Sequence, residues 1–111
     1  MTAKLIDVLA VLIFVAIGRR SHEEANSIAG LLQTAAPFLI AVALSWIVVA
    51  VTKPSGSFVP ALATWAITVS MGMLLRNLVF GEGTATSFII VTTITLFALI
   101  VGARLVAARV F

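Results

Sequence analysis

The sequence has no cysteine and few charged residues: four acids and seven lysines or arginines among 111 residues. The absence of cysteine excludes disulfides and thiolate metal sites. The single histidine, His22, lies beside Glu23 and Glu24, and three consecutive residues in a polar segment make a poor metal site. We therefore expect His22 in a solvated loop, and we expect no bound metal and no cofactor.

The sequence also has none of the motifs that usually indicate catalysis. It contains no Ser/His/Asp set, no glycine-rich phosphate loop and no pair of carboxylates at catalytic spacing. We expect that the protein is not an enzyme.

Apolar residues, in contrast, make up 62% of the chain, and the mean hydropathy is +1.25. A soluble domain is nearer half apolar, and one of this size could not bury so much apolar surface. The net charge of +3 comes from basic residues at the ends of apolar runs, which is typical of membrane topology. No basic face with interleaved aromatic residues is present, so nucleic acid is not an expected partner.

Four apolar runs are separated by a polar segment, a Pro-Ser-Gly-Ser turn and a Gly-Glu-Gly turn. They predict one all-α domain over residues 1–111, a polytopic antiparallel bundle of four transmembrane helices. The predicted spans are residues 4–18, 28–51, 59–80 and 85–106. The first span also resembles a signal peptide, but the acid within it, Asp7, favours a retained helix.

Four spans place both termini and the loop at Lys53 on one side of the membrane. The basic residues on that side are Lys4, Lys53, Arg104 and Arg109, and those on the other side are Arg19, Arg20 and Arg76. Four against three favours cytoplasmic termini in the plasma membrane. Trp46 and Trp65 would form an aromatic belt near the termini.

Arg76 lies about one turn from the end of the third span, on one helical face with Thr64, Thr68 and Gly72. A charge inside the bilayer costs about 2.5–3.5 kcal/mol on insertion scales, so it usually snorkels, pairs or lines a polar cavity. One interpretation makes Arg76 an interfacial anchor. The other turns it into the bundle, where hydroxyls of the fourth span and loop glutamates would satisfy it.

The fourth span has a face of small and hydroxylated residues that we expect to pack against the third span. This face consists of Thr84, Ser87, Val91, Thr95, Ala98 and Gly102. The threonines favour close packing, and the alternative is a polar path through the membrane.

Asp7 is the only acid within a predicted span. It either caps the first turn or pairs with Arg104 on the same side of the membrane, both of which are structural roles. The alternative is a functional role, because an acid inside a membrane helix commonly couples protons or binds a cation.

Several blocks together resemble one family. They are the residues from Asp7 to His22 (DVLAVLIFVAIGRRSH), APF, TWAITVSMGMLLR and GEGTATSF. In this order they are similar to a family of small prokaryotic membrane proteins, common in actinobacteria and known as domain of unknown function 3054. The resemblance implies a four-span membrane protein without an assigned activity. The positions that it implies to matter are Asp7, Arg19, His22, Trp65, Arg76 and Thr84.

We expect a polar cluster of Arg19, Arg20, Arg76 and the loop glutamates on the side away from the termini. A bundle this small leaves little room for a cavity, which favours an accessory, assembly or binding module in a homo-oligomer or a larger membrane complex. The alternative is a small homodimeric transporter or channel that uses Asp7 and the Arg76 cluster. Four spans and weak charge bias resemble the small multidrug resistance transporters in architecture, although Asp7 lies nearer the helix end than the acid of those proteins.

Overall fold

The computed structural model describes residues 2–21, 28–79 and 86–110, and these residues contain helices and no strand. The elements are α1 (Thr2–Ser21), α2 (Ile28–Thr52), α3 (Phe58–Leu74), η1 (Leu75–Val79), α4 (Thr86–Leu96), η2 (Phe97–Gly102) and α5 (Ala103–Val110). The segments η1 and η2 are π-helical, so α3 continues into η1, and α4, η2 and α5 follow one another without a break.

The turn between α2 and α3 is short and well defined. Lys53 and Gly56 both adopt positive φ, 49° and 75°, and so reverse the chain direction. The Lys53 N–H still donates to the Val49 carbonyl at 2.9 Å, which closes the last turn of α2. Pro60 lies in the first turn of α3, where its missing N–H costs no helical hydrogen bond. The two helices are therefore joined as a hairpin.

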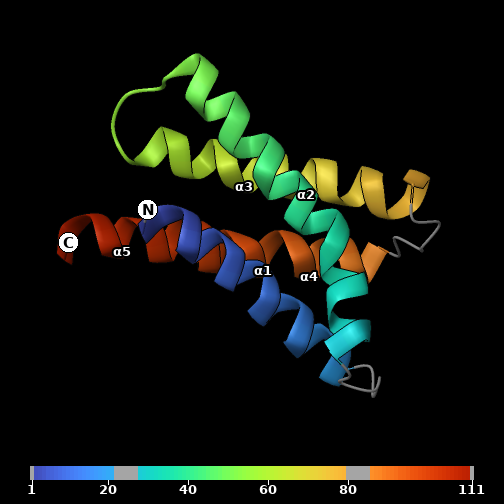
Figure 1. Ribbon diagram of the computed structural model, residues 1–111. Coiled ribbons are helices and arrows are strands. Elements are labelled where there is room, and N and C mark those ends of the chain that lie inside the picture. The colour runs from blue at the N-terminus through green and yellow to red at the C-terminus, as the bar shows by residue number, and fades with distance from the viewer. Residues whose placement is uncertain (1, 22–27, 80–85, 111) are drawn as a thin grey trace.

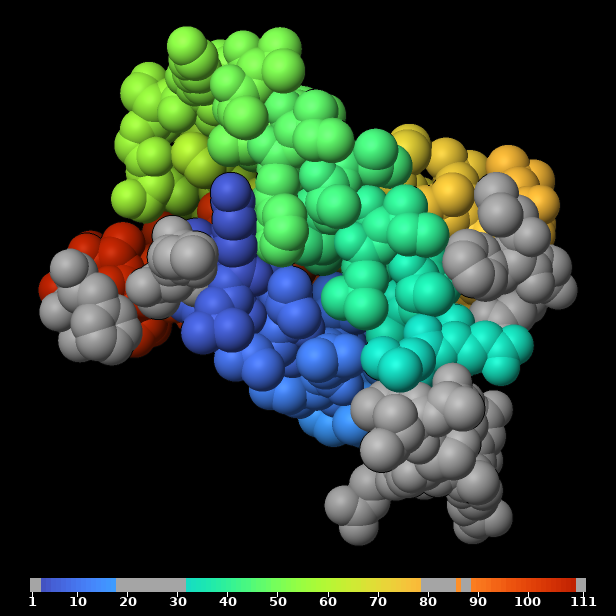
Figure 2. Space-filling model, in the orientation of Figure 1, coloured from blue at the N-terminus to red at the C-terminus, as the bar shows by residue number. Residues whose placement is uncertain are grey.

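The helices run back and forth, with both ends of the described chain at the same end of the molecule (Figure 1). The start of α1, the turn between α2 and α3, and the end of α5 all lie at this end. The helices α2 and α3 pack against each other most extensively, and α1 packs against α2, α4, η2 and α5. The space-filling view shows α1 lying directly against α2 (Figure 2).

Three helical stretches are long and apolar enough to cross a membrane: Leu32–Thr52, Phe58–Leu78 and Ile89–Arg109. The structure thus confirms the all-α class and supports a membrane protein. The helix α1 is not among the three. It has 20 residues, or about 30 Å of helix, and its crossing of the membrane stays a prediction.

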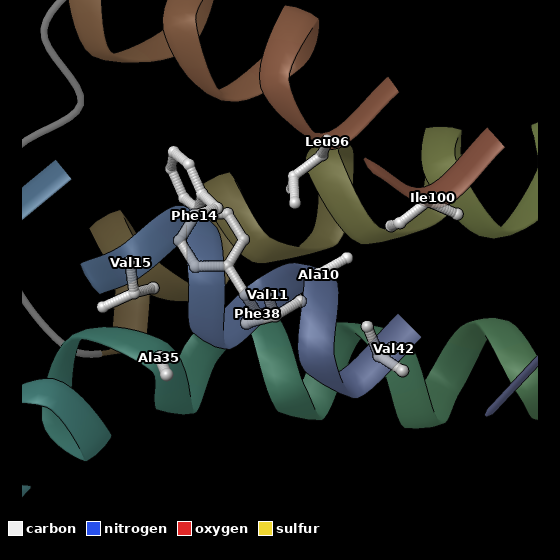
Figure 3. Close-up of a cluster of buried hydrophobic side chains, with 9 residues drawn as sticks. All are labelled: Ala10, Val11, Phe14, Val15, Ala35, Phe38, Val42, Leu96 and Ile100. Atoms are coloured by element: carbon white, nitrogen blue, oxygen red, sulfur yellow. The ribbon is translucent and has the colours of Figure 1, made fainter. Parts of the chain in front are cut away.

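A small apolar core lies between α1, α2 and the α4–η2 helix (Figure 3). Its members are Ala10, Val11, Phe14, Val15, Ala35, Phe38, Val42, Leu96 and Ile100. Phe14 and Phe38 meet edge to face, with ring centroids 5.7 Å apart. Many large apolar side chains outside this core are exposed, as expected for helices that face lipid.

The prediction of which face of the fourth helix is buried is wrong. Thr92, Leu96 and Ile100 are the fully buried positions, whereas Val91 is 54% exposed and Ala98 is also exposed. A regular α-helix drifts away from an every-fourth-residue pattern because it has 3.6 residues per turn. The wider π-helical turn of η2 counteracts that drift, so residues four apart stay on the inner side through Ile100.

Candidate functional site

Asp7 lies on the inner face of α1, one turn before the core residues Ala10 and Val11, and its exposed fraction is 0%. Arg104, from α5, donates from Nε to Asp7 Oδ1 at 2.9 Å and from Nη2 to Asp7 Oδ2. These two parallel bonds form a bidentate ion pair, which is the geometry in which guanidinium binds carboxylate best. The Arg104 side chain is 12% exposed. The pair is therefore buried on the acid side and nearly buried on the basic side.

A third bond to Asp7 comes from α2. The indole N–H of Trp46 donates to Asp7 Oδ2 at 2.8 Å. The Lys4 ammonium lies over the Trp46 ring, 5.7 Å from its centroid, within the range of a cation–π contact. The carboxylate of Asp7 therefore connects three helices, α1, α2 and α5.

These bonds decide which chemistry is open to Asp7. An ionised carboxylate offers about four lone-pair positions, and three of them are occupied here. The pairing with Arg104 was one of the structural roles expected from the sequence, and it is confirmed. Its geometry links α1 to α2 and α5.

The sequence pattern predicted Trp46 in an aromatic belt and did not indicate it as a partner of Asp7. A usable signal existed, because Trp46 and Asp7 were both assigned to the membrane side of the termini. An indole N–H is a donor that needs an acceptor when it leaves water. Trp65 follows the same rule: its N–H donates to the Thr93 carbonyl at 2.9 Å.

A second polar region lies on α3. Thr64 and Thr68 are both 0% exposed, and neither Oγ1 atom has a hydrogen-bond partner among the described residues. Gly72, one turn further, is buried against Phe38 of α2, and a Cβ at Gly72 would lie 2.7 Å from Phe38 Cε1. The shared face of Thr64, Thr68 and Gly72 is thus confirmed and buried, but Gly72 packs against α2, whereas the sequence predicted that this face would meet the fourth span.

The remaining predicted site residues are not gathered around Asp7. Arg76 is half-buried in η1. The segment η1 follows α3 at the end of the molecule opposite the start of α1 (Figure 1). Arg19 and Arg20 lie in the last turn of α1 and Ser87 in the first turn of α4, and their side chains are outside what the structure describes. His22, Thr84 and the glutamates 23, 24 and 82 lie outside the described residues altogether. The cluster around Arg76 therefore stays a prediction.

No group of three or more His, Asp or Glu side chains that could hold a metal ion occurs within residues 2–21, 28–79 and 86–110. Asp7 is the one acid in these ranges, because the other three acids of the sequence fall between them.

Comparison with known proteins gives one match. A family model described as "Protein of unknown function (DUF3054)" matches residues 4–107, nearly the whole chain. No curated protein and no solved structure matches the chain.

Proposed function

This chain belongs to the DUF3054 family, and from that premise we propose that it is an accessory or assembly module of the plasma membrane. In this role it crosses the membrane four times and binds other membrane helices, either of further copies or of a larger complex. It has no reaction of its own. The family description assigns no activity, so the proposal is drawn from the geometry.

The observation that carries the proposal is that the carboxylate of Asp7 is buried and bonded to Arg104 and Trp46. A transporter that couples protons or cations needs an acid that can gain and lose its partner. Asp7 instead accepts three hydrogen bonds from two other helices and is fully buried. A carboxylate held in this way stabilises one arrangement of helices, which suits a rigid binding module.

The same pairing supports a fourth membrane crossing by α1. An unpaired carboxylate would make insertion of this helix costly, and the bidentate bond to Arg104 neutralises it. On α1 the residues Leu5, Leu9, Ile13 and Ile17 follow at every fourth position, and all four are exposed. This stripe is open to lipid and to helices of another protein.

Site-specific photo-crosslinking in native membranes tests the assembly role. A photoreactive residue at Ile13, in the exposed stripe, should give a discrete crosslinked species, of a size that fits a second copy or one partner. The matched control is Val11, which lies on the same helix and is fully buried, and should give no intermolecular product. A chain that yields only lipid adducts from Ile13, and that purifies without a stoichiometric partner, is not an assembly module.

The topology has its own test, made simple by the absence of native cysteine. Single cysteines at Ala3, at the start of α1, and at Ser55, in the turn between α2 and α3, are both expected to face the cytoplasm, because α1 and α2 separate them. In intact cells both should resist a membrane-impermeant thiol reagent and react after permeabilisation. Labelling of one but not the other in intact cells would rule out four crossings.

A small homodimeric transporter or channel is the second candidate, and one observation favours it. Thr64 and Thr68 place two hydroxyls inside the helix packing, where a polar path would need them. Purified protein in proteoliposomes should then show ion or solute flux that Asp7→Asn or Arg76→Ala reduces. Equal flux in wild type and both variants, or no flux at all, removes this candidate.

A further inference from the structure

The two hydroxyls on α3 differ from the other hydroxyls whose bonds the structure shows. Thr52 donates to the Val48 carbonyl at 2.8 Å, and Thr93 donates to the Ile89 carbonyl at 2.7 Å. Such bonds to the carbonyl four residues earlier are the usual way for a helical threonine to satisfy its hydroxyl. Thr64 and Thr68 make no bond of this kind, although they are fully buried.

An unsatisfied hydroxyl is costly in a bilayer, because no bulk water is available to replace the missing partner. Two of them, one turn apart on the same face, double that cost. A buried polar atom without a protein partner commonly bonds an ordered water. The pair at Thr64 and Thr68 therefore points to an occupant that can bond both hydroxyls.

The helix facing this pair carries small side chains. Phe38 of α2 packs against Gly72, and α2 and α3 run in opposite directions (Figure 1). One and two turns from Phe38, α2 carries Ala41 and Ser45, both fully buried. By this register they lie at the levels of Thr68 and Thr64, with the Phe38 ring at the end of the row.

We propose that the interface between α2 and α3 binds a single buried water molecule, held by the hydroxyls of Thr64 and Thr68. Side chains four apart on a helix have Cβ atoms about 5–6 Å apart. Two hydrogen bonds of about 2.8 Å that meet at the near-tetrahedral angle of a water join oxygens about 4.5 Å apart, and rotation about the Cα–Cβ bonds brings the two Oγ1 atoms to that distance, so one water bridges the pair.

Ser45 supplies a third partner to the proposed site. Its hydroxyl donates to the Val42 carbonyl at 2.6 Å, which leaves its oxygen lone pairs free to accept. The site is independent of the assembly role, since it depends only on packing within one chain.

Valine substitutions test the site because valine matches threonine in shape and lacks the hydroxyl. With a bound water, Thr64→Val and Thr68→Val should each lower the folding equilibrium constant about tenfold, measured by reversible SDS unfolding in mixed micelles. The double variant should be more stable than either single variant, because the water leaves with the first hydroxyl and the second valine then removes a hydroxyl that has lost its partner. Thr93→Val is the matched control, since its hydroxyl bonds its own helix at the lipid side.

Two empty hydroxyls would behave in the opposite way. Each valine would then raise the folding equilibrium constant, and the two gains would multiply in the double variant, which would overturn the proposal. A serine at either position keeps the hydroxyl, so Thr68→Ser should retain the water even if the valine variants fold poorly.

A direct measurement detects the occupant itself. Proton-detected solid-state NMR of the protein in lipid bilayers should show magnetisation transfer from water to the protons of Thr64 and Thr68. The signal should persist in Thr68→Ser and disappear in the double valine variant. Absence of transfer in the wild-type protein would refute the bound water.

Discussion

The molecule buries two polar regions, and they differ in how their polar atoms are hydrogen-bonded. The carboxylate of Asp7 accepts three hydrogen bonds, from Arg104 and Trp46. The hydroxyls of Thr64 and Thr68 have no partner among the described residues. A charge in a low-dielectric interior is tolerated only when it is paired with an opposite charge and hydrogen-bonded. A neutral hydroxyl costs less to bury without a protein partner, and it can bond a small molecule instead. The first region joins helices, and the second is where we propose a bound water.

The largest expected effect comes from breaking the ion pair. Asp7→Asn leaves Arg104 nearly buried without a counter-charge, and removal of one partner of a buried pair typically costs about 3–5 kcal/mol. The free energy of unfolding, from SDS titration, should fall by that amount. The double variant Asp7→Leu/Arg104→Met, which removes both charges, should recover most of the loss. Equal stability of Asp7→Asn and wild type would mean that the two regions do not differ as described.

The next effect separates the third bond to Asp7 from the ion pair. Trp46→Phe keeps an aromatic ring and removes the N–H donor, and a hydrogen bond to a charged group contributes about 1.5–3 kcal/mol. Trp65→Phe is the matched variant, because it removes a bond to the neutral Thr93 carbonyl and should cost only about 1 kcal/mol. Both losses are read from the free energy of unfolding. If the order is reversed, the charge of Asp7 adds nothing to the bond from Trp46.

The region of Thr64 and Thr68 is tested at Gly72, where α3 packs closely against Phe38 of α2. Gly72→Ala places a Cβ 2.7 Å from Cε1 of the buried Phe38 ring, and such overpacking typically costs about 1–3 kcal/mol. Gly102→Ala is the control, since nothing lies within 4 Å of its added Cβ. The control should keep or slightly raise the free energy of unfolding. A Gly72→Ala variant as stable as the control would show that α2 and α3 are not closely packed there.

The smallest effect is expected at the edge of the ion-pair region. Lys4 is exposed and its ammonium lies over the face of Trp46, and exposed cation–π contacts contribute about 0.5–1 kcal/mol. Lys4→Gln should therefore lower the free energy of unfolding by at most that amount. A much larger loss would mean that Lys4 stabilises the ion pair of Asp7 and Arg104 as well as contacting Trp46.

Composition and short loops were enough to predict the helices, because segments that can cross a membrane are recognised in a sequence by their length and apolarity. Phe58 and Thr86 begin helices close to the predicted starts at residues 59 and 85. The pairing of Asp7 with Arg104 was also predictable, since few charges occur and both lie on one side of the membrane. The sequence blocks DVLAVLIFVAIGRRSH, APF, TWAITVSMGMLLR and GEGTATSF predicted membership of the family, which is confirmed.

The buried face of the fourth helix was not predictable from regular helical spacing. Thr92, rather than Val91 or Thr95, is fully buried, and the π-helical turn at Phe97–Gly102 carries that alignment onward. A π-helical turn depends on the packing of neighbouring helices, and no single residue type signals it. The sequence placed Trp46 and Asp7 on the same side of the membrane, but the direction of the Trp46 N–H is set by how α2 lies against α1, which spacing alone does not encode.

The ion pair has a consequence for how the protein is made. Asp7 and Arg104 are 97 residues apart in the sequence, so the acid leaves the ribosome long before its partner exists. Until the last helix is made, the carboxyl group of the first helix has no guanidinium beside it. Any chain that stops short of Arg104 therefore leaves Asp7 without the cation that pairs with it.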